Sequence, residues 1–269
     1  MPTMDTERNT EFAGNPTDVE AAADERAAQG RQPEVASEAA AGQQLTPDGH
    51  DTPAAEHEPA PEPDHVDIIL ASGSPRRKQL LEEARIRFTV HVSEVDETLD
   101  ADVLAEPSEA AKKLAERKAG AVVQEVLASD YRGAAVVLGA DTMVVLDNTI
   151  FGKPKSLSDA KGMLRKLSGR THEVLTAVSV WMVMAPEPEK VSLGFRTFCD
   201  TSRVAFKELT DDEITAYLKC GESFDKAGAY AIQGEGAKLA TLVEGELDTV
   251  IGLPVGRLQR EFPDIFVAE

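Results

Sequence analysis

Cysteine is scarce in this sequence, and no stretch is apolar for long enough to cross a membrane. The 269 residues contain two cysteines, Cys199 and Cys220, with no Cys-x-x-Cys pair and no cluster of histidines. We therefore expect neither a disulfide framework nor a zinc site. No window approaches the roughly 18 apolar residues of a membrane span, and the N-terminus lacks the layout of a secretory signal. These absences predict a soluble, cytoplasmic protein with no membrane partner.

Basic residues are also few, and the acidic excess is unevenly spread. The chain has 28 lysines and arginines against 48 aspartates and glutamates, a net charge of -20 and a pI near 4.7. A protein that binds nucleic acid through its phosphates needs a basic face, so we expect no nucleic-acid partner. Residues 1–65 alone carry 3 basic and 15 acidic residues, which is more than half of the excess negative charge.

Residues 1–65 offer little that could form a hydrophobic core. They hold eight of the 15 prolines but a single aromatic residue, Phe12, and they are rich in alanine, proline and glutamate. Such a segment cannot bury enough apolar surface to offset the loss of chain entropy on folding. A helix is the alternative for the alanine-rich middle, but without an apolar stripe it would be marginal in water. We predict a disordered acidic tail over residues 1–65 and one folded domain over residues 66–269.

Within residues 66–269, apolar runs alternate with segments of helical periodicity. Strands are predicted at residues 66–71, 88–92, 134–138, 143–146 and 174–184, with a strand pair over 191–206 and a hairpin through 244–245. Helices are predicted at residues 76–84, 107–127 and 158–167, after the capping box at Thr210 and after Pro254. Because tight turns join several neighbouring strands, we expect an α/β fold with a mixed, twisted sheet and flanking helices.

The segment from Ser72 to Arg77 joins a predicted strand to a predicted helix. Ser74 suits the N-cap and Pro75 the first helical position, so free backbone N–H groups face this loop. Together with Arg76 and Arg77, these groups could bind phosphate oxygens through charge-assisted hydrogen bonds. The alternative is a capped helix with two solvated arginines, and the segment alone does not decide between the two.

Acidic residues follow two of the predicted strands. Asp141 comes after the apolar run 134–138, so we expect it at the carboxyl end of a buried strand, where α/β sheets place their sites. A buried carboxylate requires a cation or several hydrogen-bond donors. Asp96 and Glu97 could supply further oxygen ligands for Mg²⁺, and an exposed acidic turn is the alternative for this pair.

Three lysines fall close to these segments. Lys118 lies on the apolar stripe of the helix predicted at 107–127, whereas Lys153 and Lys226 lie in loops that contain glycine. Each has a plain structural explanation, as an aliphatic stem at the edge of the core or as a solvated loop residue. Taken with the arginines and the carboxylates, however, they form the set that a metal-bound polyphosphate requires.

Other common nucleotide and hydrolase motifs do not match. Gly152-Lys153 is followed by Pro154 and lacks the earlier glycine of a phosphate loop, and Gly234-Glu-Gly236 lacks the third glycine of a dinucleotide fingerprint. No Gly-x-Ser-x-Gly sequence occurs, so we expect His172 to be structural and not a member of a catalytic triad.

Eight short motifs follow one another along the folded part of the chain. They are Leu70-Ala-Ser-Gly-Ser-Pro-Arg-Arg-Lys-Gln-Leu-Leu81, Asp96-Glu-Thr98, Gly139-Ala-Asp-Thr142, Gly152-Lys-Pro154, Leu167-Ser-Gly-Arg-Thr-His172, Phe224-Asp-Lys-Ala-Gly-Ala-Tyr230, Ile232-Gln-Gly234 and Gly252-Leu-Pro254. In this order they resemble the successive signatures of the Maf (septum-formation) family of nucleoside triphosphate pyrophosphatases. The similarity covers residues 66–269 and leaves out residues 1–65. One departure is Ala84-Arg85, which stands where the family usually has Leu-Gly after the first helix.

This resemblance implies a Maf/ITPase-like fold with a central nucleotide cleft, usually in a homodimer. It implies cleavage of a nucleoside triphosphate to the monophosphate and pyrophosphate with a divalent cation, Mg²⁺ or Mn²⁺. Carried onto the matching positions, it makes Asp141 the proton acceptor, places Glu97 beside it at the metal and adds Lys153 to the catalytic group. The substrate-binding residues that it implies are Ser72, Arg76, Lys118, Thr142, Asp225, Lys226 and Gln233.

Arg76, Thr142 and Gln233 make the sequence similar to the subgroup that prefers dTTP and UTP, and Thr142 and Gln233 would recognise the pyrimidine edge. Asp141 or a nearby carboxylate would activate water for attack at the α-phosphorus. Three alternatives stay open. The enzyme could be specific for 7-methyl-GTP, or the protein could be a nucleotide-binding regulator of cell division without turnover. In the third alternative the acidic tail carries the function and the folded domain serves as its docking site.

Overall fold

The structure is a computed structural model that describes residues 66–268, apart from residues 93 and 188. The acidic tail predicted over residues 1–65 lies outside the described residues. In the described part of the chain, no helix combines the length and the hydropathy that crossing a membrane requires.

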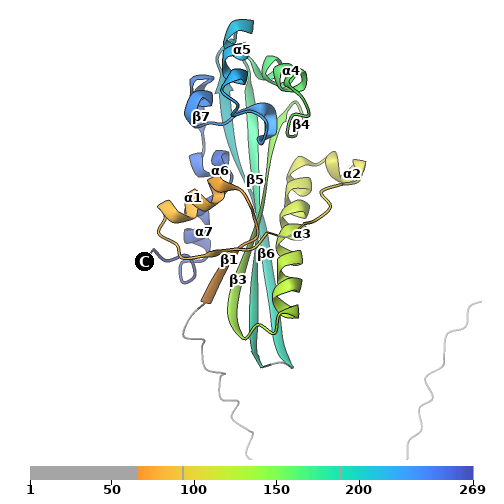
Figure 1. The fold of residues 1–269 in the computed structure, drawn as a ribbon, viewed down its shortest axis with the longest axis vertical. Coiled ribbons are helices and arrows are strands. Elements are labelled where there is room, and N and C mark those ends of the chain that lie inside the picture. The colour runs from red at the N-terminus through yellow and green to blue at the C-terminus, as the bar shows by residue number, and fades with distance from the viewer. Residues whose placement is uncertain (1–65, 93, 188, 269) are drawn as a thin grey trace, which may run out of the picture. The chain divides into compact units, whose positions relative to one another are not determined.

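A seven-stranded mixed sheet forms the centre of the fold (Figure 1). The strand order is β2-β1-β3-β5-β6-β7, and β4 pairs with the far end of β3. Strand β1 pairs in parallel with β2 and β3, and the other strand pairs of the described residues are antiparallel, so the expectation of a mixed sheet is confirmed. The strands are β1 (Val66–Leu70), β2 (Thr89–Val90), β3 (Gly133–Leu146), β4 (Thr149–Phe151), β5 (Thr171–Glu187), β6 (Lys190–Phe206) and β7 (Ala240–Glu244).

The long strands β3 and β6 correct two predictions. The runs at 134–138 and 143–146 are one continuous strand, because Gly139 does not turn the chain. It lets a helix approach instead: a Cβ at this position would lie 2.3 Å from the carbonyl oxygen of Ala115. The strand pair predicted over 191–206 is likewise the single strand β6, which pairs with β5 along nearly its whole length.

The helices begin and end close to their predicted positions. Pro75 is the first residue of its helix, and Thr210 and Glu213 form the capping box that the sequence predicts. Arg85, which stands where the resembled family has glycine, adopts a φ of 57° just after the first helix. The helices are α1 (Pro75–Glu83), α2 (Ala101–Leu104), α3 (Pro107–Ala128), α4 (Leu157–Leu167), α5 (Asp211–Lys219), α6 (Leu247–Ile251) and α7 (Val255–Glu261), with short 3₁₀ turns η1 (Ala227–Ala229) and η2 (Gly234–Lys238).

The hairpin predicted through residues 244–245 is wrong. Strand β7 ends at Glu244 and the chain enters α6, not a returning strand. Ser202 on β6 donates a hydrogen bond from its hydroxyl to the carbonyl oxygen of Glu246, at 2.9 Å. This contact ties the segment to the sheet, and Val250 of α6 then packs into the core.

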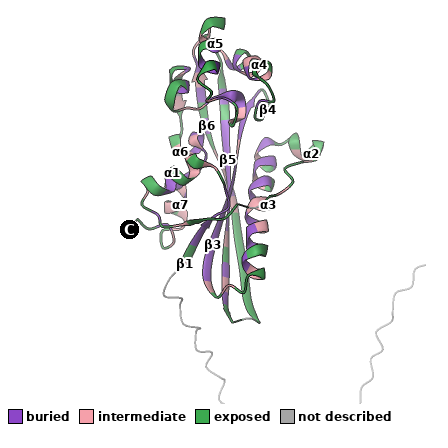
Figure 2. Cartoon of the chain, in the orientation of Figure 1, coloured by how far each residue is buried: buried purple, intermediate pink, exposed green. Residues whose placement is uncertain are grey.

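The two faces of the sheet are covered differently, and this difference positions the cleft described below. Helix α3 packs along one face, where its buried residues Val122 and Val126 meet Val137 and Val183. On the opposite face, α1 and α7 pack over one part of the sheet and α4 and α5 over another. Figure 2 shows the resulting buried residues along the central strands and the inner side of α3.

Candidate active site

A cleft of about 780 Å³ opens beside the middle of β3. Strand β1 pairs with β3 only as far as Leu138, and β4 pairs with it only from Val144 onward. On that edge, therefore, residues 139–143 of β3 have no strand partner among the described residues. All ten predicted site residues line the cleft, namely Ser72, Arg76, Glu97, Lys118, Asp141, Thr142, Lys153, Asp225, Lys226 and Gln233.

Asp141 lies in the interior of β3 and not at the end of a strand, which corrects the sequence prediction. The neighbouring parallel strand β1 has ended by this level, so the carboxylate still lies beyond the carboxyl end of β1. Asp141 is 8% exposed, and its side chain faces α3, where it contacts Lys118. Asp141 and Thr142 consequently point to opposite faces of the sheet while both line the cleft.

Lys118 of α3 holds the two predicted catalytic carboxylates together. Its Nζ lies 2.6 Å from Oδ1 of Asp141 and 2.9 Å from Oε1 of Glu97. Burial raises the pKa of Asp141 above its ordinary value, although Lys118 and Arg77 oppose the shift. Burial also acts to raise the pKa of Glu97, but Lys118 and the charge of Lys153 outweigh it and the net pKa is lowered. The site therefore separates the proton affinities of two neighbouring carboxyl groups, as acid–base catalysis requires.

The same two carboxylates fit a divalent cation. Asp141 and Glu97 already converge on one positive group, the Lys118 ammonium, and both offer oxygen atoms of the kind that Mg²⁺ or Mn²⁺ prefers. No group of three His, Cys, Asp or Glu side chains that could hold a metal occurs among the described residues. A protein site with two carboxylates is typical of Mg²⁺ when phosphates and water supply the remaining ligands.

Asp96 does not join this pair. Its Oδ1 accepts a hydrogen bond from the backbone N–H of Thr98 at 2.8 Å, and its side chain is absent from the cleft lining. The hydrogen bonds from Thr98 lower the pKa of this carboxyl group. The exposed acidic turn, which the sequence left open for both residues, therefore describes Asp96, and Glu97 alone faces the cleft.

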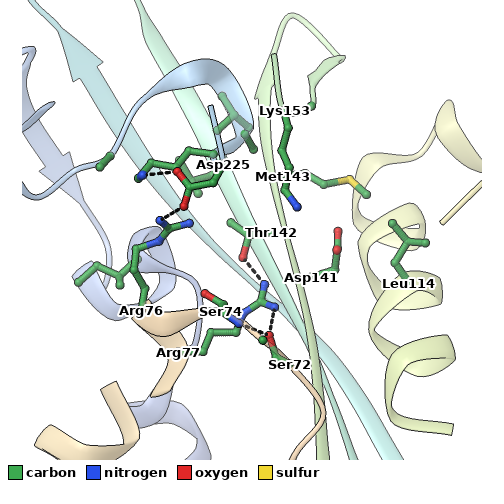
Figure 3. Close-up of a pocket in the computed structure, with 18 of the residues that line it drawn as sticks. Ser72, Ser74, Arg76, Arg77, Leu114, Asp141, Thr142, Met143, Lys153 and Asp225 are labelled. Carbon is green, nitrogen blue, oxygen red and sulfur yellow. Dashed lines mark hydrogen bonds and ion pairs between the residues drawn. The ribbon is translucent and has the colours of Figure 1, made fainter. Parts of the chain in front are cut away.

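The basic residues reach the cleft from separate segments. Lys153 follows β4 and points toward Asp141 and Thr142 (Figure 3). Arg76, at the start of α1, contacts Asp225 with its Nη1 at 3.2 Å from Oδ2, and Asp225 also pairs with Lys226. Burial acts to raise the pKa of Asp225, but the contacts with Lys226 and Arg76 lower it overall.

Arg77 has a role that the sequence did not reveal. The sequence predicts that it converges with Arg76 on the phosphates, yet its guanidinium is hydrogen-bonded to the protein itself (Figure 3). Nε donates to the carbonyl oxygen of Gly252 at 2.8 Å, Nη1 to Oγ of Ser72 at 3.0 Å and Nη2 to Oγ1 of Thr142 at 3.2 Å. Burial lowers the pKa of Arg77, an effect that the charge of Asp141 opposes. Adjacent arginines on a helix point about 100° apart, so their different surroundings depend on tertiary contacts.

His172 is buried on β5 and does not line the cleft. Its Nε2 lies 2.7 Å from Oη of Tyr230, and burial lowers the pKa of the imidazole to about 4. Tyr230 lines the cleft, so the histidine supports one of its walls. This position agrees with the structural role predicted for His172.

Comparisons with known proteins agree on one family. The model of the family described as "Maf-like protein" matches residues 67–264. A dTTP/UTP pyrophosphatase of Bacillus cereus (strain AH187) is 45% identical over 194 residues, which cover 72% of this chain and 93% of that protein. A dTTP/UTP pyrophosphatase of Bacillus velezensis is 44% identical over 193 residues, with the same two coverages.

Among solved structures, the nucleoside-triphosphatase or dITP/XTP pyrophosphatase of Mycobacterium abscessus is 12% identical, with a TM-score of 0.35. The similarity covers 73% of this chain and 93% of that chain.

Proposed function

The chain belongs to the Maf-like protein family, and from this premise we propose that it hydrolyses dTTP and UTP to the nucleoside monophosphate and pyrophosphate. The observation that carries the proposal is the cleft itself, which gathers basic side chains around the buried Asp141 in an otherwise acidic chain. Two relatives that the chain covers over 93% of their length bear the name dTTP/UTP pyrophosphatase.

The charge of the cleft suits a polyphosphate ligand, but a metal cation is needed to balance the rest of the negative charge. Five basic and four acidic residues line it, so its formal charge is slightly positive although the whole chain carries -20. Local positive potential, and not the total charge, determines which ligands a cleft attracts. A triphosphate carries several negative charges, however, which one net positive charge does not balance. The basic residues are Arg76, Arg77, Lys118, Lys153 and Lys226, and the acidic residues are Glu94, Glu97, Asp141 and Asp225.

Asp141 and Glu97 are the residues that would hold Mg²⁺ or Mn²⁺. The cation would supply Lewis-acid stabilisation of negative charge on the phosphate oxygens. Lys118 fixes the position of both carboxylates through its two contacts of 2.6 and 2.9 Å. We propose that Asp141, whose pKa is raised by burial, accepts the proton of the water that attacks the α-phosphorus.

The other cleft residues act on the two ends of the nucleotide. Arg76, Lys153 and Lys226 stabilise the charge that develops on the departing pyrophosphate, and Ser72 lies next to the N-terminus of α1. At the base, Thr142 and Gln233 supply hydrogen-bonding groups that select a pyrimidine.

Replacement of Asp141 with Asn tests this proposal. Pyrophosphate release from dTTP and UTP in the presence of Mg²⁺ or Mn²⁺ should fall by about 10³-fold, because the amide cannot accept the proton. Asp96→Asn is the matched control, since this carboxylate lies one residue from Glu97 but outside the cleft, and it should keep its activity. Full activity in a folded Asp141→Asn variant would remove Asp141 from its proposed role. A wild-type protein that releases pyrophosphate from no nucleotide would overturn the function itself.

We further propose that the protein is a cytoplasmic homodimer, as the family resemblance implies. Support comes from β6, where Val191, Leu193 and Phe195 are 47%, 47% and 57% exposed. Strand β7 pairs only with residues 203–206, so within the described residues the rest of this edge of β6 has no strand neighbour. Light scattering on the full chain should give twice the monomer mass, and a monomer at micromolar concentration would contradict the proposal.

A further inference from the structure

A row of polar side chains crosses three neighbouring strands at the level of the cleft. Thr142 of β3 pairs in register with Thr176 of β5, which pairs in turn with Asp200 of β6. Directly paired residues project from the same face of a sheet, so the three side chains form one line. Thr176 is 0% exposed and does not line the cleft, whereas Thr142 does.

The direction of each hydrogen bond in this row can be assigned. The hydroxyl of Thr176 lies 2.7 Å from the carbonyl oxygen of Thr249, and a carbonyl oxygen can only accept, so Thr176 must donate its single proton there. Thr176 and Thr142 are also in contact, with 3.0 Å between their Oγ1 atoms. Because the proton of Thr176 is already used, Thr142 is the donor in this second bond.

Arg77 completes the assignment for Thr142. Its Nη2 donates to Oγ1 of Thr142 at 3.2 Å, so that oxygen accepts one hydrogen bond and gives its only proton to Thr176. A hydroxyl group has one proton and two lone pairs. One lone pair of the Thr142 hydroxyl therefore remains for a ligand, and this hydroxyl can meet a ligand only as an acceptor.

The residues behind Thr176 hold this arrangement in place. Thr249 of α6 is 0% exposed and donates from its hydroxyl to Oδ2 of Asp200 at 3.2 Å. The other oxygen of Asp200 accepts from Nη1 of Arg257 at 2.9 Å. Gly252, just after α6, accepts from Nε of Arg77, so the chain of hydrogen bonds closes on itself through α6. A closed, partly buried network of this kind resists reorientation of any one hydroxyl.

We propose that Thr176 is a positioning residue that determines nucleobase specificity by fixing the hydroxyl of Thr142 as an obligate hydrogen-bond acceptor. The proposal rests on the function proposed above and adds a residue that never touches the substrate. The imide N3–H of uracil or thymine is a donor and satisfies this acceptor. The N3 atom of cytosine is itself an acceptor, so it would leave two lone pairs facing each other.

The test compares uracil and cytosine nucleotides on matched variants. Thr176→Val keeps the shape of the side chain and removes its hydroxyl, which frees Thr142 to rotate and donate. The preference for UTP over CTP in kcat/KM should then fall by about 10-fold, since discrimination of this type depends on buried polar groups that the wrong base leaves unpaired. Thr176→Ser keeps the hydroxyl and should restore the preference.

Thr197→Val is the control. This residue lies on the same pair of strands and donates to the buried Ser179 at 3.0 Å, but it does not line the cleft. It should leave the UTP to CTP ratio unchanged even if it lowers stability. A general loss of structure would lower both rates together, so the ratio separates positioning from folding. An unchanged ratio in a folded Thr176→Val variant would overturn the proposal.

Two further measurements test the proposal if the Thr176→Val variant does not fold or if the protein shows no turnover. The wild-type protein should use 5-methyl-UTP well and 3-methyl-UTP at least about 10-fold less well, because only the latter lacks the imide donor. Equal use of both would overturn the acceptor assignment. Calorimetric binding of UTP and CTP without added metal gives the same preference without turnover. A preference for UTP in binding that Thr176→Val loses, together with no pyrophosphate release by the wild-type protein when Mg²⁺ or Mn²⁺ is added, would contradict the proposed function and support the role of Thr176.

Discussion

Asp141 and Thr142 are neighbours on β3, yet their side chains enter different surroundings on opposite faces of the sheet. On the α3 face, Asp141 meets the ammonium of Lys118 and the second carboxylate, Glu97. On the other face, Thr142 meets the guanidinium of Arg77 and the neutral hydroxyl of Thr176. One strand can therefore supply a charged group and a group of fixed hydrogen-bond direction to the same cleft, each tuned by its own neighbours.

From this contrast we expect that substitutions can change the rate of hydrolysis and the choice of base separately. Changes on the charged face should affect every nucleotide alike, because they act on the phosphates that all substrates share. Changes in the hydrogen-bonded residues Thr142, Thr176 and Thr249, here called the hydroxyl row, should alter the ratio between nucleotides. Three experiments test this separation, and they follow in order of decreasing effect.

Replacement of Lys118 with Met should have the largest effect. Asp141 and Glu97 would lose the cation that holds them together, and a buried carboxylate would remain uncompensated. We expect kcat/KM to fall by about 100-fold or more for UTP and CTP alike, as for other preorganised charges in active sites. Lys113→Met is the control, since it changes the same type of residue on the exposed side of α3. A fall confined to one nucleotide would show that the two faces are not independent.

The two arginines at the start of α1 should respond differently to the same substitution. Arg77→Met removes three hydrogen bonds and leaves Thr142 and Gly252 without their donor, so we expect the free energy of unfolding to fall by about 2 kcal/mol. Arg76→Met removes one partly exposed ion pair and should cost less than about 1 kcal/mol while raising KM. Urea denaturation of both variants measures the difference. Equal losses of stability would mean that Arg77 does not hold the hydroxyl row in place.

His172 should give the smallest effect, a dependence of stability on pH. Burial lowers the pKa of His172 to about 4 from the ordinary value of 6.5, so between these values the unfolded chain binds more protons than the folded chain. Stability should therefore decrease as the pH falls, by about 2 kcal/mol between about pH 7 and pH 5.

The variant His172→Phe should lose this contribution to the pH dependence of the urea midpoint. Because His172 packs beside Phe206 and Tyr230, away from Asp141, the pH profile of kcat/KM should keep its shape in this variant. An unchanged pH dependence of stability would show that another group carries it. A shift in the pH profile of kcat/KM in this variant would show that His172 and Asp141 are coupled across the sheet.

The fold could be predicted from the sequence where the signals are local. Pro75 at the start of α1 and the capping box at Thr210 act within a few residues, and both are present in the structure. Gly139 misled the prediction, because glycine also allows close packing of a helix on a strand, and only the position of α3 distinguishes the two uses. The single strand β6 and the missing hairpin at 244–245 likewise depend on partners distant in the sequence.

The candidate site also contains residues that local motifs predict and residues that only tertiary contacts bring together. Family resemblance predicts ten of the residues that line the cleft, because these ten lie in short motifs. The hydroxyl row has no local motif: Thr142, Thr176 and Thr249 meet only because the register of β3 and β5 and the placement of α6 bring them together. The sequence identifies Arg77 only as one of a pair of arginines, because its inward contacts depend on Gly252, which is 175 residues away along the chain.

The most direct test of the separation between the two faces measures kcat/KM for UTP and CTP on Lys118→Met and Thr176→Val side by side. We predict that the Lys118 variant loses activity on both nucleotides by the same factor and keeps the wild-type ratio. The Thr176 variant should lower the UTP to CTP ratio by about 10-fold and retain most of its activity on the two nucleotides together. If the Lys118 variant changed the ratio, or if the Thr176 variant lowered both activities without changing it, the account would be contradicted.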